Sequence, residues 1–102
     1  MNRRLAVLEK MVQSGQADSF ARYGLAMEYR REGRIDDALA TFDALRATDP
    51  GYVPMYLMAG QMLADAARGA EARAWLEAGR DSAKEKGDAH ALGEIETLLA
   101  SL

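Results

Sequence analysis

Few side chains in this sequence could act as catalytic groups or metal ligands. Its 102 residues include one histidine, His90, and no cysteine. A zinc or iron site needs several imidazole, thiolate or carboxylate ligands. Because there is no second imidazole and no thiolate to share a metal, we expect His90 to be a solvated or packed residue near the start of a helix. The sequence therefore predicts no metal site and no cofactor.

Paired carboxylates are the other candidates for catalysis, because acid–base chemistry can use two of them. Asp36 and Asp37 are adjacent, and adjacent residues of a helix point in different directions. They also fall where a predicted helix begins, a position that favours acidic residues through the helix dipole. Glu94 and Glu96 form the second pair. No serine lies in a nucleophile-elbow sequence, and the glycines form no phosphate-binding loop. We therefore expect a protein that is not an enzyme.

The charge balance argues against nucleic acid as a partner. Thirteen basic and sixteen acidic residues give a formal net charge of -3, whereas a nucleic-acid binder needs a basic surface that neutralises phosphates. Apolar residues make up 49% of the chain, which is enough to form one core. Aromatic residues are few and only two prolines occur, which favours helices over sheets.

The apolar stretches are too short for a membrane or a secretion signal. Glu9 and Lys10 interrupt the first one, and a signal peptide needs roughly 7–15 uninterrupted apolar residues. The apolar run at 54–60, even with the apolar residues just before it, is far below the about 20 residues that cross a bilayer. We therefore expect a cytoplasmic protein with no membrane partner.

Apolar residues recur at helical spacing through the whole chain. In the first segment, the residues at helical spacing on one apolar face are Leu5, Leu8, Met11 and Val12. Gly33 is placed to end the second helix, and Pro50 begins a turn after the third. The pattern predicts an all-α fold of about six helices, at about residues 2–14, 19–32, 35–48, 53–66, 70–86 and 88–101.

Two of the predicted helical hairpins repeat each other with a period of about 34 residues, and a fixed period of this length indicates an array of helical repeats. Ala38 and Phe42 in the first hairpin correspond to Ala72 and Leu76 in the second. Small residues in matching positions let two helices approach, and large residues fill the space between them.

This pattern resembles the tetratricopeptide repeat, a helix–turn–helix of about 34 residues. The family's positions are filled in the first repeat by Arg22, Leu25, Ala26, Tyr29, Ala38, Phe42 and Pro50. They are filled in the second repeat by Tyr56, Ala59, Gly60, Leu63, Ala72 and Leu76, with Lys84 where the proline would be. The resemblance implies a right-handed array of helical hairpins, similar to small bacterial proteins made only of such repeats.

The ends of the chain match the repeat poorly. If a third repeat followed with the same period, its first helix would have His90, Gly93, Glu94 and Thr97 in the family's positions. These residues do not match the residue types that the family has there. We therefore predict one domain over 1–102, with repeats at about 19–52 and 53–86 and capping helices at about 2–14 and 88–101. The missing proline after the fifth helix suggests that this helix is longer than usual.

The resemblance also implies a binding surface, because the first helix of each pair lines the concave groove in this family. The residues in the groove positions are Phe20, Tyr23, Met27, Arg30, Arg31, Leu57 and Gln61. An apolar groove with a polar rim suits an amphipathic helix or an extended apolar peptide of a partner protein. Methionine adapts to several shapes. Arg30 and Arg31 either form a charged surface with the acidic residues close by, where exposed pairs contribute little energy, or steer an acidic segment of the partner.

Members of the family that grip chaperone C-terminal carboxylates use a lysine and an asparagine at the places of Tyr23 and Met27, and another asparagine at Met58. This chain has none of these residues at the three positions, so we exclude that class of partner.

Two alternatives to the groove remain open. In one, the last helix folds into the groove and completes the core, since stacked repeats need about three units for stability. In the other, the apolar helix face of one chain covers that of a second chain in a homodimer. An enzyme acting on a small molecule is the least supported possibility.

Overall fold

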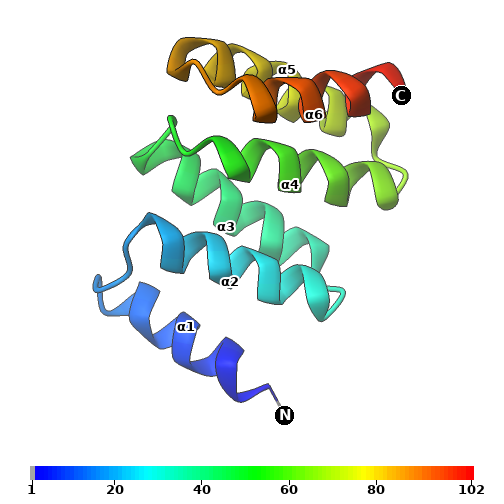
Figure 1. The fold of residues 1–102 in the computed structure, drawn as a ribbon. Helices are drawn as coiled ribbons and strands as arrows, with labels where there is room; N and C mark the ends of the chain where they lie inside the picture. The colour runs from blue at the N-terminus through cyan, green and yellow to red at the C-terminus, as the bar shows by residue number, and fades with distance from the viewer. Residues whose placement is uncertain (1) are drawn as a thin grey trace. The chain divides into compact units, whose positions relative to one another are not determined.

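The computed structural model describes residues 2–102, and it contains six α-helices and no strand within that range (Figure 1). The helices are α1 (Arg3–Gln13), α2 (Ser19–Arg31), α3 (Ile35–Thr48), α4 (Val53–Asp65), α5 (Gly69–Lys86) and α6 (Ala89–Ala100). Every helix end lies within one residue of the sequence-based prediction, and the all-α fold is confirmed.

Local chemistry explains where several of these helices begin and end. The side chains of Asn2, Asp18 and Asp88 each accept a hydrogen bond from a backbone N–H in the first turn of α1, α2 and α6. Such N-caps satisfy donors that a helix cannot pair internally. Gly33, after α2, has a positive φ of 75°, which an L side chain rarely adopts.

The chain divides into two compact units, of which one ends at Asp49 and the other is Pro50–Leu102. The first contains α1, α2 and α3, and the second contains α4, α5 and α6. Each unit therefore holds one predicted hairpin and one predicted capping helix.

In the first unit, α2 and α3 form a closely packed hairpin. Tyr23 and Phe42 meet edge to face, with ring centroids 6.5 Å apart. Ala26 and Ala38 are fully buried, as expected for the small positions of the repeat. The absence of larger side chains there allows the two helices to approach closely.

The first helix is tied to α2 by a hydrogen bond across the interface. The Tyr29 hydroxyl donates to Glu9 Oε2 at 2.6 Å, and the Arg34 guanidinium lies 4.6 Å from the centre of the tyrosine ring. Burial and the bond to the Glu9 carboxylate raise the pKa of Tyr29 to about 12. The neutral phenol is therefore the form that the fold stabilises.

Glu28 on α2 is the buried charged residue of this unit, and its partners come from the start of the chain. Asn2 Nδ2 donates to Glu28 Oε2 at 3.0 Å, and Arg4 Nε lies 3.4 Å from Glu28 Oε1. Because a buried carboxylate needs such partners, these contacts fix the N-terminal end of α1 on α2.

In the second unit, α5 packs on both α4 and α6. Leu76 lies against the backbone of Gly60 on α4, and Ile95 of α6 approaches Gly79. The rings of Tyr56 and Trp75 are 6.0 Å apart, which adds an aromatic contact between α4 and α5. The glycines at 60 and 79 leave the room that these large side chains occupy.

The fifth helix is 18 residues long, compared with 14 for α3, which agrees with the prediction from the missing proline. Gly87 ends it with a φ of 71°, and the Asp88 N–H donates to the Ala83 carbonyl. The extra length changes the repeat spacing. The step from Ser19 to Val53, where α2 and α4 begin, matches the repeat period, whereas the step from Val53 to Ala89, where α6 begins, is longer.

Candidate functional site

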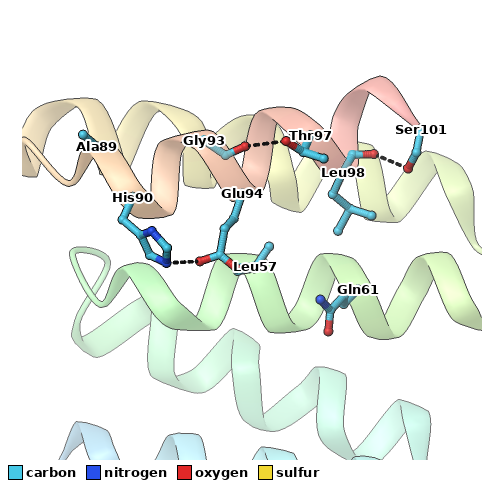
Figure 2. Close-up of a pocket in the computed structure, with 9 residues that line it drawn as sticks. All are labelled: Leu57, Gln61, Ala89, His90, Gly93, Glu94, Thr97, Leu98 and Ser101. Atoms are coloured by element: carbon cyan, nitrogen blue, oxygen red, sulfur yellow. Dashed lines mark hydrogen bonds and ion pairs between the residues drawn. The ribbon is translucent and has the colours of Figure 1, made fainter.

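A cavity of about 640 Å³ lies in the second unit between α4 and α6. The side chains and backbone that line it are those of Leu57, Gln61, Ala89, His90, Gly93, Glu94, Thr97, Leu98 and Ser101. Leu57 and Gln61 come from α4, and the others come from α6 and the residue after it (Figure 2). The cavity is an open groove with one wall from each helix.

One wall owes its shape to small residues repeated every four positions. Ala89, Gly93, Thr97 and Ser101 lie on one side of α6, so the backbone of this helix is exposed to the groove. The hydroxyl of Thr97 donates to the Gly93 carbonyl at 2.9 Å, and that of Ser101 donates to the Leu98 carbonyl at 2.7 Å (Figure 2). A segment bound here can approach α6 closely.

The rim of the groove carries one polar pair. His90 Nε2 lies 3.0 Å from Glu94 Oε1, and Figure 2 shows the Glu94 carboxylate pointing from α6 toward α4, near Leu57. The His90 side chain is largely exposed and that of Glu94 is half exposed, so we assign this i,i+4 pair little energy. Leu57 is only 9% exposed, and part of it belongs to the core of this unit.

The groove has the chemistry of a binding surface. It offers apolar contact at Leu57 and Leu98, and the Gln61 amide supplies a donor and an acceptor. Within residues 2–102, no three His, Cys, Asp or Glu side chains lie together as a metal site would require.

The five predicted groove residues of the first unit all lie on one side of α2. Phe20 is 71% exposed, and Tyr23 and Met27 follow it at intervals of three and four residues, both partly buried. Arg30 and Arg31 continue this side toward the end of the helix. The first unit therefore presents an apolar stripe that ends in two arginines.

The position of α6 bears on the alternative in which the last helix fills the groove. In the second unit α6 packs mainly on α5, and Ile95 is the residue that it buries completely. Gln61 remains only partly buried, and the space beside it stays open. Within this unit α6 forms a wall of the groove and does not fill it.

Sequence reasoning missed the α6 wall. With the strict repeat period the third repeat fitted poorly, whereas the observed start of α6 places Gly93 and Thr97 at the positions of Leu57 and Gln61. The same spacing places Ile95, a buried residue, at the position of Ala59. The four-residue recurrence of small residues from Ala89 was the signal that could have revealed this wall.

Comparison with known sequences decides the family. The sequence model of the tetratricopeptide repeat family matches residues 29–94, which include most of the first predicted repeat and all of the second. The chain belongs to the tetratricopeptide repeat family. The family prediction from the sequence is therefore confirmed, and no curated protein sequence matches the chain.

Solved structures support the same assignment. A tetratricopeptide repeat domain protein from Salinibacter ruber is 32% identical; in its crystal structure the match covers 83% of this chain and 94% of that one, with a TM-score of 0.74. The solution structure of the Salinibacter protein gives coverages of 82% and 85% and a TM-score of 0.76. A protein from Bordetella parapertussis is 27% identical, with coverages of 99% and 88% and a TM-score of 0.79.

Membership of the tetratricopeptide repeat family identifies this chain in general terms as a protein–protein interaction module. The family is generally a non-catalytic interaction repeat. Among residues 2–102, no helix has the length and apolar character needed to span a bilayer.

Proposed function

We propose that this protein is a non-catalytic module that binds one segment of a partner protein. The segment is an amphipathic helix or an extended apolar peptide, and it binds at Phe20, Tyr23 and Met27 of α2 and at Leu57 and Gln61 of α4. The observation that carries the proposal is the open groove between α4 and α6, because two of the predicted binding residues line it.

The groove of the second unit suits a protein segment better than a small metabolite. It is open along α4 and α6, and its polar groups are spread along the rim rather than gathered at one point. Small-molecule sites usually enclose most of the ligand and place a few polar groups to converge on it. A helix or peptide needs apolar contacts with polar groups beside them. Leu57, Ala89 and Leu98 offer the apolar contacts, and polar side chains lie along the rim.

The apolar stripe on α2 is the second surface at which we propose that the partner segment binds. Large aromatic side chains dominate the energy of many protein interfaces, and Phe20 is the most exposed large apolar residue among those described. Arg30 and Arg31 follow one turn after Met27. We therefore propose that the partner segment carries an acidic residue next to its apolar anchors.

Selection from a displayed peptide library, followed by NMR titration of the labelled protein, tests this function. Selected peptides should share an apolar pattern with an adjacent acidic residue. They should shift the amide signals of Tyr23, Met27, Leu57 and Gln61 more than signals of α3, whose Asp43 is exposed. Failure to select any peptide, or shifts confined to residues away from α2, α4 and α6, would contradict the proposal.

A further inference from the structure

The first helix carries an apolar depression on the side that faces away from α2. Leu5 and Leu8 lie on the α2 side of this helix, with Leu5 buried and Leu8 beside Gly24. On the other side Val7 is 55% exposed. Val7, Lys10, Met11, Ser14 and Gln16 line a depression of about 350 Å³ whose surface is mostly apolar. Apolar side chains of another protein that packed here would remove this apolar surface from water.

Basic side chains flank this depression. Arg3 lies four residues before Val7 and Lys10 lies three residues after it, so all three share one side of α1. Both basic residues are exposed, and neither forms an ion pair with any residue in 2–102. A surface that packs here should carry apolar groups together with negative charge.

The last helix carries a surface of that kind. Leu92 and Leu99 rest partly on the core of the second unit and keep part of their surface open. Glu96 lies between them on the same side of α6, exposed and with no ion pair to the described residues. Leu102, beyond the helix, is 41% exposed.

We propose that α6 of one copy packs on α1 of a second copy. The leucines of α6 cover the depression at Val7, and Glu96 faces Arg3 and Lys10. Charge complementarity between these two surfaces of the same chain selects a second copy as the occupant. Repeat proteins stack helices so that each contacts only its neighbours, and a copy's α1 supplies such a neighbour to α6.

The two surfaces differ, so the contact is heterologous, and one copy can bind a second copy through α1 and a third through α6. The helices have only 11 and 12 residues, which places the contact at the small end of protein interfaces, below about 1,200 Å². We expect association to be half complete at a protein concentration of about 0.1–1 mM and to weaken as salt screens the charges.

Two charge-reversal variants test the pairing by analytical ultracentrifugation. Glu96→Lys makes the α6 surface basic, and the double variant Arg3→Glu/Lys10→Glu makes the α1 surface acidic. All three positions are exposed, so helical content by circular dichroism should not change. The wild type should gain average mass with concentration, and each variant alone should remain monomeric.

The mixture of the two variants gives the decisive result. Each variant supplies the surface that the other lacks, so an equimolar mixture should associate again. A chain with all three substitutions should also self-associate, because its ends are complementary with reversed signs. A wild type that stays monomeric up to about 1 mM, or single-surface variants that associate as the wild type does, would overturn the proposal.

Discussion

The Leu76 side chain of α5 lies directly against the backbone of Gly60 on α4, so that a Cβ atom at position 60 would come within 2.5 Å of Leu76 Cγ. Both residues are buried, and the side chain of Leu76 is fully enclosed. The separation of α4 and α5 therefore depends on glycine at this position, and the orientation of α4 beside the groove depends on that separation.

Gly60→Ala should destabilise the protein by about 1–2 kcal/mol, because the added methyl group overpacks this contact by more than the improved helix propensity gains. Gly93→Ala is the matched control, since a Cβ there meets no atom of another element within 4 Å. That control should gain about 0.5–1 kcal/mol of stability, because alanine is the better helix former. Urea unfolding of both variants measures the difference, and equal effects at the two glycines would show that the close approach is unimportant.

Tyr29→Phe should cost about 1 kcal/mol of stability, because it removes the hydrogen bond to Glu9 and leaves the ring in place. The loss should depend on pH. The pKa of Tyr29 is about 12 in the folded protein and 10.0 in its ordinary state, so folding favours the protonated phenol. Its stabilising effect is complete below pH 10 and is lost as the pH rises through 12.

The measurement for Tyr29 is the free energy of unfolding of wild type and Tyr29→Phe at a series of alkaline pH values. The difference between the two proteins should shrink above pH 10. A difference that stays constant across this range would mean that the hydrogen bond to Glu9 does not form in solution.

Asp88→Ala should lower the stability of α6 by about 1 kcal/mol. The substitution removes the side chain that accepts the hydrogen bond from the Ala91 N–H at 3.0 Å. Asp88→Ser keeps an oxygen that can cap the helix and should behave like the wild type. Amide hydrogen exchange in α6 reports the change directly. Equal exchange in the alanine and serine variants would show that the cap does not stabilise α6.

The repeat period was enough to predict most of the fold from the sequence. Ala38 and Phe42 recur one period later as Ala72 and Leu76, and these residues pack between the helices as the period implied. The periodicity of apolar residues also located every helix end to within one residue. These features are local or strictly periodic, so single-sequence reasoning could detect them.

The groove wall was not predictable in the same way. The longer α5 shifts α6 relative to the repeat period, so the alignment placed Gly93 in the wrong position. Packing of Ile95 against Gly79 then determines which side of α6 faces the groove. The contact between Tyr29 and Glu9 was missed for a related reason, since pairing between different helices leaves no periodic signal in one sequence.

Met27→Glu should abolish binding of the partner segment while the fold survives, because Met27 is partly exposed in the predicted binding stripe of α2. A charge there would have to be desolvated on binding, which costs several kcal/mol when it has no partner. Asp43→Glu, at an exposed position on α3, is the matched control. Isothermal titration of a selected peptide gives both affinities, and retained binding by Met27→Glu would remove α2 from the binding surface.

If the groove between α4 and α6 binds the partner, a side chain that enters the groove should weaken binding, and the affinity of Gly93→Leu for a selected peptide measures this. Apart from its chain neighbours and the backbone of its own helix, no atom lies within 4 Å of a Cβ at position 93, so the leucine side chain should extend into the groove without disturbing the fold. Gly69→Leu has equally open surroundings at the start of α5, away from the groove, and serves as the control. We expect at least about tenfold weaker binding for Gly93→Leu, or about 1.4 kcal/mol, with unchanged binding for Gly69→Leu. Wild-type affinity in a folded Gly93→Leu protein would show that the partner does not bind in this groove.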